Sequence, residues 1–113
     1  MSNLRNKVQL IGRLGVDPEI IELDSGKKLA KFAMATSEAY TNAAGEKIED
    51  TQWHRIVVWG KLTDVVDKYV KKGKEIAVEG KLTHQKYEDK EGINRYTTEI
   101  IVHDIQLFGN KST

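Results

Sequence analysis

The fold of this chain is decided by the stretch Trp53-His54-Arg55-Ile56-Val57-Val58-Trp59 and by the residues that follow it. Aromatic and β-branched side chains dominate these seven positions, which predicts a strand. Directly afterwards the apolar residues change period and fall at i, i+3, i+4, i+7 and i+8, at Leu62, Val65, Val66, Tyr69 and Val70. That spacing predicts one apolar face of a helix, with Gly73 placed to end it.

Strand patterns flank this helix on both sides. They cover residues 7–14, 19–23, 28–37, 75–87 and 96–108, with turn signals between them. Gly80 inside the fourth of these indicates a bulge or bend, and the polar residues 41–51 predict a loop or mobile hairpin. Residues 53–59 and these segments, without the short strand at 19–23, make five main strands, and the helix lies between the third and the fourth. This is the connectivity of the OB-fold. We therefore expect an all-β, five-stranded Greek-key barrel.

The length of 113 residues suits one domain, which we place at residues 1–108, with a short polar tail at 109–113. No apolar run approaches the roughly 18 residues of a membrane span, and the N-terminus lacks a secretory signal pattern. We therefore expect a cytoplasmic chain without a membrane partner. The chain has no cysteine, which removes disulfides and thiolate metal sites.

Residues for catalysis are not grouped in this sequence. His54, His84 and His103 are far apart and form no metal-ligand motif, and the glycines form no phosphate-binding loop. An enzyme needs a nucleophile with a base, paired acids or metal ligands. We expect a protein that is not an enzyme and that uses no metal or cofactor.

Basic and aromatic residues occur together in one segment. The net charge is only +1, but residues 51–87 contain eight basic and four acidic side chains. Trp53, Trp59 and Tyr87 lie in the same segment. Clustered Lys and Arg are typical of a surface that binds a polyanion, although a solvated lysine-rich surface gives the same count.

The two tryptophans share one face of the predicted strand because six residues separate them. Arg55 and Val57 lie on that face, whereas His54, Ile56 and Val58 lie on the other. If the tryptophan face is exposed, its flat rings can stack on bases and Arg55 can neutralise a phosphate. The alternative is that both tryptophans are barrel core and Arg55 reaches solvent at an edge. The pattern leaves both open.

Two tyrosines flank predicted loops and could extend such a stacking surface or simply pack at the rim. They are Tyr40 and Tyr87. Several lysines could follow a nucleic-acid backbone, namely Lys61, Lys71, Lys72, Lys81 and Lys86.

The chain resembles the bacterial single-stranded DNA-binding proteins over nearly its whole length. The resemblance is carried by Asn6-Lys7-Val8, residues 10–15, Asp17-Pro18-Glu19, residues 35–38, residues 53–62, Tyr69, Lys72-Gly73, Val78-Glu79-Gly80 and residues 95–99. It implies an OB-fold homotetramer that binds single-stranded DNA without sequence preference and protects it in replication, recombination and repair, near the nucleoid.

The resemblance also implies site residues. The stacking aromatics match Tyr40, Trp53, Trp59 and Tyr87, and the matching basic positions are Arg55, Lys61, Lys72 and Lys86. Thr83 and Gln85 stand where some relatives are basic, and His54 matches a position associated with subunit assembly.

The family usually ends in an acidic tip that recruits replication and repair proteins, and the tail at 109–113 lacks one. Recruitment of such partners is expected only if the full-length protein has that tip. Two other functions remain open: an OB-fold adaptor that acts mainly through proteins, and a small hydrolase or nuclease on the same barrel.

Overall fold

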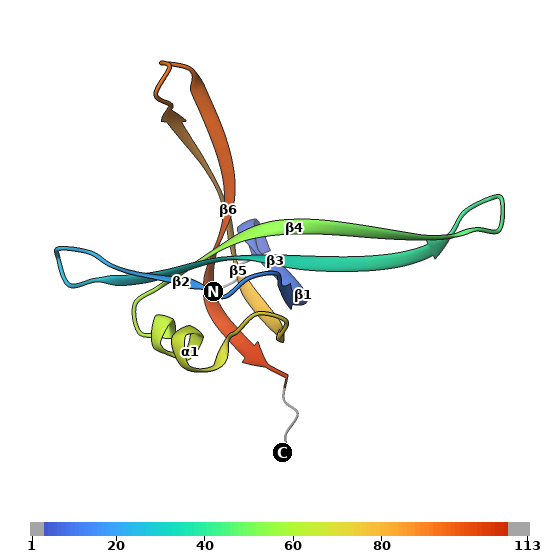
Figure 1. Ribbon diagram of the computed structural model, residues 1–113, viewed down its shortest axis with the longest axis horizontal. Coiled ribbons are helices and arrows are strands. Elements are labelled where there is room, and N and C mark those ends of the chain that lie inside the picture. Colours follow the sequence, from blue (N-terminus) through green and yellow to red (C-terminus); the bar gives the residue numbers. More distant parts are fainter. Residues whose placement is uncertain (1–3, 109–113) are drawn as a thin grey trace.

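The computed structural model describes residues 4–108, and the tail predicted at 109–113 lies outside them. Figure 1 shows the elements in chain order. They are the 3-10 helix η1 (Leu4–Asn6), the strands β1 (Val8–Leu14), β2 (Glu19–Glu22), β3 (Lys28–Thr41) and β4 (Lys47–Trp59), the helix α1 (Leu62–Tyr69), and the strands β5 (Glu75–Glu88) and β6 (Asn94–Leu107).

The strands close into a barrel. Their order is β1-β5-β6-β4-β3-β2, and an additional pairing of β1 with β3 completes the ring. The β4–β6 pairing is parallel, whereas the other pairings are antiparallel. Short β2 extends the sheet beside β3, so five strands form the wall. This connectivity, with α1 between β4 and β5, confirms the predicted OB-fold.

The core consists of inward-facing side chains that alternate along each strand. Its most buried members include Met34 on β3, Ile56 and Val58 on β4, and Ile76 on β5, all at 1% exposure or less. Helix α1 packs Val66 against this core. Ile56 and Val58 belong to the core cluster, so the face of β4 that carries them is the inner face of the barrel.

Two details around α1 differ from the prediction. The helix ends at Tyr69, because Val70 has extended backbone angles, and Gly73 lies in the following turn with φ 85°. The Gly73 amide donates to the Leu14 carbonyl at 2.9 Å, which attaches this turn to β1. Tyr69 is 56% exposed, so it does not belong to the buried helix face.

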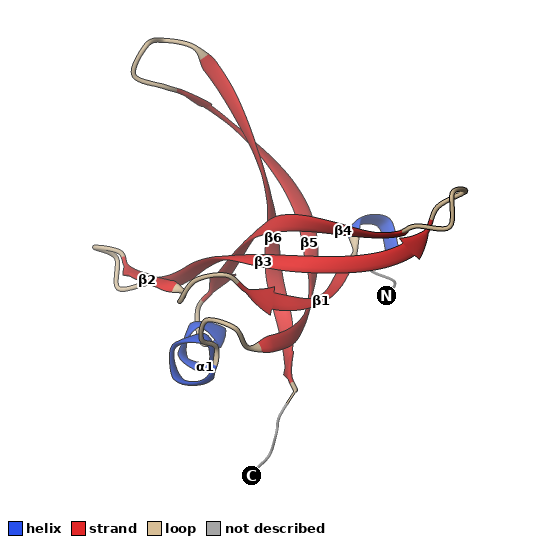
Figure 2. Cartoon of the chain, turned by 45° about the vertical axis from the view of Figure 1, so that its right-hand side comes forward, coloured by secondary structure: helices blue, strands red, loops and turns tan. Residues whose placement is uncertain are grey.

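Two long hairpins extend from the barrel in different directions (Figures 1 and 2). We name them the β3–β4 arm (residues 37–51) and the β5–β6 arm (residues 84–98). Of the predicted loop or mobile hairpin over residues 41–51, the structure shows a hairpin, whose second strand begins at Lys47. The connecting turn is short: Asn42 Oδ1 accepts hydrogen bonds from the Ala44 and Glu46 amides, both at 2.9 Å.

The predicted irregularity at Gly80 is confirmed. The β5–β6 register shifts between Glu79 and Gly80. A Cβ atom at Gly80 would collide with the Ile101 carbonyl of β6, so only glycine fits this close approach of two backbones.

Candidate nucleic-acid interface

Both tryptophans lie on the outside of the barrel. Trp53 is 60% exposed and Trp59 is 43% exposed, whereas Ile56 and Val58 on the opposite face of β4 are buried. This placement decides between the two alternatives that the sequence pattern left open. The outer face of β4 presents two indole rings and Arg55 to solvent.

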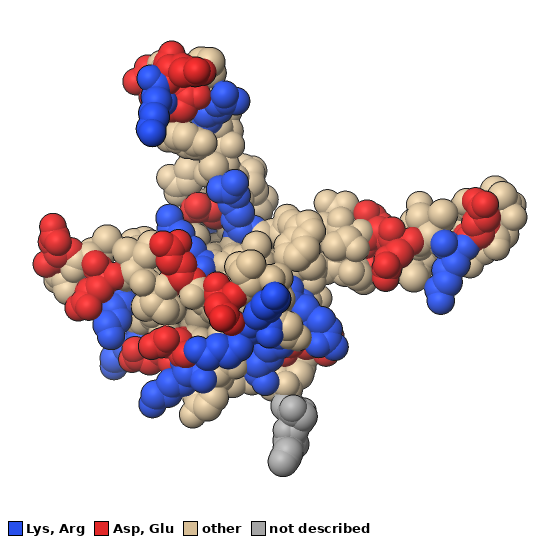
Figure 3. Space-filling model, viewed as in Figure 1, with Lys and Arg blue, Asp and Glu red and all other residues tan. Residues whose placement is uncertain are grey.

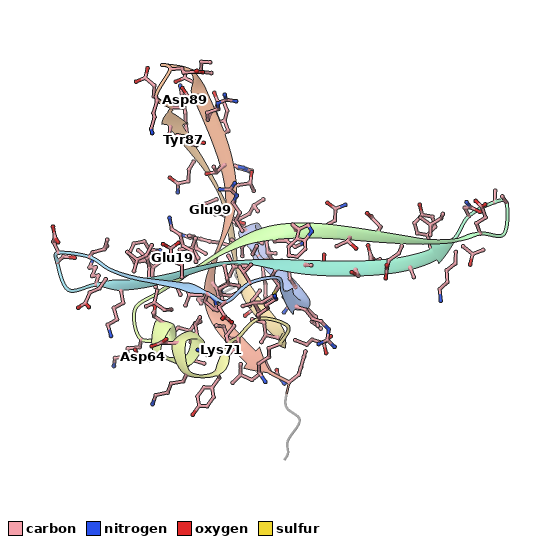
Figure 4. All side chains as sticks on the ribbon, viewed as in Figure 1. Glu19, Asp64, Lys71, Tyr87, Asp89 and Glu99 are labelled. Carbon is pink, nitrogen blue, oxygen red and sulfur yellow. The ribbon has the colours of Figure 1, made fainter. Side chains whose placement is uncertain are left out.

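The outer face continues from β4 onto the β5–β6 arm. Residues that are register partners on neighbouring strands lie on the same face of the sheet. Arg55 is the partner of Glu99 on β6, and Glu99 is also the partner of Thr83 on β5. Tyr87 follows Thr83 by four residues and therefore lies on the same face. It is 49% exposed, and Figure 4 shows it near the end of the arm, with Glu99 at the base. One surface thus contains Trp53, Arg55, Trp59 and Tyr87.

The centre of this surface is less open than the pattern suggests. Val57, between Arg55 and Trp59, is only 4% exposed. Its register partners are Lys31 on β3 and Ile101 on β6. Val57 lines an outer depression together with Val16, Lys31 and Arg55. The exposed rings of the two tryptophans are therefore separate platforms rather than one continuous stack.

Trp53 lies directly over a glycine of the segment that follows β1. A Cβ atom built on Gly15 would be 2.6 Å from Cη2 of the Trp53 ring, which is closer than real packing allows. Gly15 also donates its amide to the Ala33 carbonyl at 3.4 Å. The absence of a side chain at residue 15 therefore lets the Trp53 ring rest against the barrel.

Two candidate residues lie on the other face of the arms. The β3–β4 register pairs Ala35 with Trp53 and Tyr40 with Ile48. Five residues separate Ala35 from Tyr40, so Tyr40 points away from the face of Trp53. Lys86 pairs with Tyr96 and precedes Tyr87 in β5, so its side chain points to the other face of the arm. Of the eight candidates, Tyr40 and Lys86 are therefore not brought together with the tryptophans.

The two remaining candidates are exposed lysines at the ends of the helix region. Lys61 precedes α1 and lines the same cavity as Trp59. The Lys72 amide donates to Asp17 Oδ1 at 2.8 Å. Asp17 in turn lines an outer depression of about 280 Å³ that includes Arg55, so Lys72 lies at the border of the outer face.

The β5–β6 arm contains a cation that was not among the candidates. Arg95 is the register partner of Tyr87 on the outer face. Its Nε atom is 2.9 Å from Oδ2 of Asp89, whose Oδ1 accepts hydrogen bonds from the Glu91 and Ile93 amides. The Arg95 side chain and these amides hold the pKa of Asp89 below its ordinary value. The sequence alone does not identify Arg95 as a site residue, because its position next to Tyr87 depends on the pairing of β5 with β6.

Charge is unevenly distributed over the molecule (Figure 3). Lys and Arg side chains gather on the barrel around α1, whereas the β3–β4 arm has four acidic residues and one basic residue. A phosphate backbone is attracted to the first region and repelled by the second.

Two of the three histidines, His54 and His84, form side-chain hydrogen bonds. His54 Nε2 is 2.9 Å from the Thr36 hydroxyl, and His84 Nδ1 is 3.0 Å from that of Thr98. Within residues 4–108 no group of three or more His, Asp or Glu side chains is placed to hold a metal ion. No helix in this range is long and apolar enough to cross a membrane.

An OB-fold barrel with exposed aromatic rings and cations on one face belongs to the class of single-strand nucleic-acid binders. Comparison with known proteins specifies the family. The model of the Single-strand binding protein family matches residues 5–108. The chain therefore belongs to the Single-strand binding protein family.

Individual relatives agree with this assignment. The chain is similar to Single-stranded DNA-binding protein 1 of Chlorobaculum tepidum, with 46% identity over 96% of this chain and 67% of that protein. The protein of the same name from Xylella fastidiosa is 43% identical over 94% of this chain and 79% of its own length.

Two solved structures share the fold. The Plasmodium falciparum SSB in its complex with ssDNA has a TM-score of 0.83 and 37% identity, over 92% of this chain and 95% of that one. A deletion mutant of the single-stranded DNA binding protein from Thermus aquaticus has a TM-score of 0.81 and 24% identity, over 94% of this chain and 51% of that one.

Proposed function

We infer that this chain binds single-stranded DNA on the outer face of its barrel and thereby protects it in replication, recombination and repair. The observation that carries the assignment to this face is the exposure of Trp53 and Trp59 beside Arg55 on outer β4. Stacking of a base on an aromatic ring contributes about 1–3 kcal/mol and tolerates any base. The mechanism is binding alone, with no bond made or broken.

In this mechanism Trp53, Trp59 and Tyr87 stack bases, and Arg55, Lys61 and Lys72 neutralise phosphates. Tyr40 and Lys86 take part less, because they point to the other side of the arms. Thr83 and Gln85 on the outer face of the β5–β6 arm are uncharged. Arg95, the register partner of Tyr87, is a cation on that face, and its ion pair with Asp89 offsets part of its charge.

The working unit is a homotetramer in this proposal. Both arms extend beyond the barrel with few buried residues, and two-stranded ribbons are only marginally stable alone. Packing between copies would support them. His54, half-buried at the base of the β3–β4 arm, acts structurally there through Thr36. Sedimentation of His54→Ala should show dissociation at concentrations where the unaltered chain stays assembled.

The proposal is tested by anisotropy of a labelled oligo(dT) titrated with the protein at several salt concentrations. Tight binding that weakens with salt is expected, because phosphate neutralisation releases counterions. A labelled duplex of the same length serves as the control ligand. Folded protein that fails to bind oligo(dT) even at low salt would disprove the proposal and favour the adaptor function.

A further inference from the structure

A cavity of about 620 Å³ lies beside Trp59, away from the centre of the outer face. Its lining comes from the β2–β3 turn and the first residue of β3 (Gly26, Lys27 and Lys28), from the end of β4 and its continuation (Trp59, Gly60 and Lys61), and from Asp64 of α1. Figure 4 labels Asp64 on the helix beneath this corner of the barrel. Cavities of this size hold small organic molecules, a nucleotide included.

The lining of the cavity contains one aromatic side chain and an excess of positive charge. Trp59 is 43% exposed, and its register partner Leu29 is buried at 5% exposure on the same face. Three lysines and one aspartate contribute a net charge of +2 to the lining. The ion pairs within residues 4–108 use Lys7, Arg13 and Arg95, so none of them neutralises Lys27, Lys28 or Lys61.

The backbone holds these groups together. The Gly60 amide donates to the Lys28 carbonyl at 3.0 Å, and Leu29 pairs with Trp59. Gly26 and Gly60 both have positive φ, at 90° and 71°, and a Cβ atom on either would meet nothing within 4 Å. The β2–β3 turn therefore lies fixed next to the end of β4, and the space in front of it is open.

We propose that this cavity holds one nucleotide of the bound strand, with its base on Trp59 and the flanking phosphates at Lys27 and Lys28. This inference rests on the proposed function and extends the DNA path beyond the outer face onto the β2–β3 turn. A flat base and two phosphates match an indole ring between lysines. Asp64 limits the charge but leaves an excess of cations.

The test compares two double variants of equal net charge. Lys27→Gln/Lys28→Gln removes two of the three cavity lysines. Lys47→Gln/Lys86→Gln removes two exposed lysines that line no part of it, one on the acidic β3–β4 arm and one on the reverse face of the β5–β6 arm. Binding of oligo(dT) is measured over a range of salt. Each lysine that neutralises a phosphate of a single strand adds about 0.7 to the salt slope. The slope of the first variant should therefore fall by about 1.4, and that of the second should fall far less.

A second readout locates the effect at Trp59. The chain has two tryptophans, so Trp53→Phe leaves Trp59 as the single tryptophan and Trp59→Phe leaves Trp53. In the Lys27→Gln/Lys28→Gln background, quenching of Trp59 by saturating oligo(dT) should fall, whereas quenching of Trp53 should persist. Lys27→Arg/Lys28→Arg should restore both the slope and the quenching.

The outcomes separate this inference from the proposed function. If the unaltered protein binds oligo(dT) but the two double variants have equal slopes and Trp59 quenching is unchanged, the cavity is not part of the DNA path. If the unaltered folded protein does not bind at all, the proposed function fails and this inference fails with it. Thermal unfolding monitored by circular dichroism confirms that each variant is folded.

Discussion

The two arms of the molecule carry similar aromatic residues but present them differently. On the β5–β6 arm, Tyr87 lies on the face that continues from Trp53 and Arg55, opposite Arg95. On the β3–β4 arm, Tyr40 lies on the reverse face, and the arm has four acidic residues and one basic residue. The β5–β6 arm has three of each.

This difference teaches that residue type alone does not assign an aromatic side chain to a binding surface. Strand parity decides the face, and the local charge decides whether a phosphate can approach. By both criteria the β5–β6 arm extends the outer face of the barrel, and the β3–β4 arm does so much less. Substitutions on the barrel and on each arm test this division, from the largest expected effect to the smallest.

The largest effect is expected at the barrel itself, which provides the reference for both arms. Trp53→Ala or Trp59→Ala should weaken oligo(dT) binding by about 1–3 kcal/mol, since each removes a stacking ring. Equilibrium titration at fixed salt measures this loss. The conservative changes to Phe are the controls and should retain most of the affinity. No loss in either alanine variant would mean that the outer face is not the binding surface.

A related change moves a ring without removing it. Gly15→Ala places a methyl group where the Trp53 ring lies and should displace the ring. Affinity should fall by about 1 kcal/mol, the low end of what base stacking on one ring contributes. Stability should change by only about 0.5 kcal/mol, because the clash involves the end of a side chain that can move. The same change in a Trp53→Ala background is the control, because it should then have no further effect on affinity. Unaltered affinity would contradict the packing of Trp53 on Gly15.

The arms are compared directly by one substitution in each. Tyr87→Ala should cost about 1 kcal/mol of binding free energy through the loss of a stacking ring. Tyr40→Ala should cost less than about half of that, because its ring faces away from Trp53. Titrations of both variants against the same oligo(dT) make the comparison. Equal losses would show that both arms contribute alike and would disprove the proposed difference between them.

Much of this fold follows from periodicity. The change from strand-forming residues at 53–59 to helical spacing in residues 62–70 places helix α1 correctly. The start of β4 at Lys47 escapes the pattern because the β3–β4 arm has no buried face, so its strands do not alternate between apolar and polar residues. The apolar spacing extends α1 too far because Val70 is apolar and buried but has left the helix.

The surface is less predictable than the core. Both faces of residues 53–59 contain large apolar side chains, so the sequence does not tell which face is buried. Tyr40 cannot be assigned to a face without the extent of β3. The proximity of Lys27 and Lys28 to Trp59 depends on the pairing of Leu29 with Trp59, which joins residues thirty positions apart in the chain.

The salt dependence of binding by lysine variants tests the same difference between the outer face and the reverse face. Lys61→Gln or Lys72→Gln should each reduce the salt slope of binding by about 0.7, the value for one neutralised phosphate on a single strand. Lys86→Gln should reduce it less, because Lys86 lies on the reverse face beside Tyr96. The measurement is the affinity for oligo(dT) at four or more salt concentrations. A larger change for Lys86 than for Lys61 would reverse the assignment.

The smallest effect concerns the end of the β5–β6 arm at low pH. Because the pKa of folded Asp89 is lowered, the stabilisation by its charge is complete above the ordinary pKa of an aspartate. It is lost as the pH falls through the lowered value. The amide chemical shifts of Glu91 and Ile93 should report this titration, and Asp89→Asn should abolish it. A titration at the ordinary pKa would contradict the ion pair with Arg95.

The central claim, that the outer face of β4 meets the bases, is tested most directly by intrinsic tryptophan fluorescence during titration with oligo(dT). Strong, saturable quenching that weakens with salt is predicted, because both rings are exposed and would stack on bases. Binding of oligo(dT) by the folded protein without any change in tryptophan fluorescence would contradict the account.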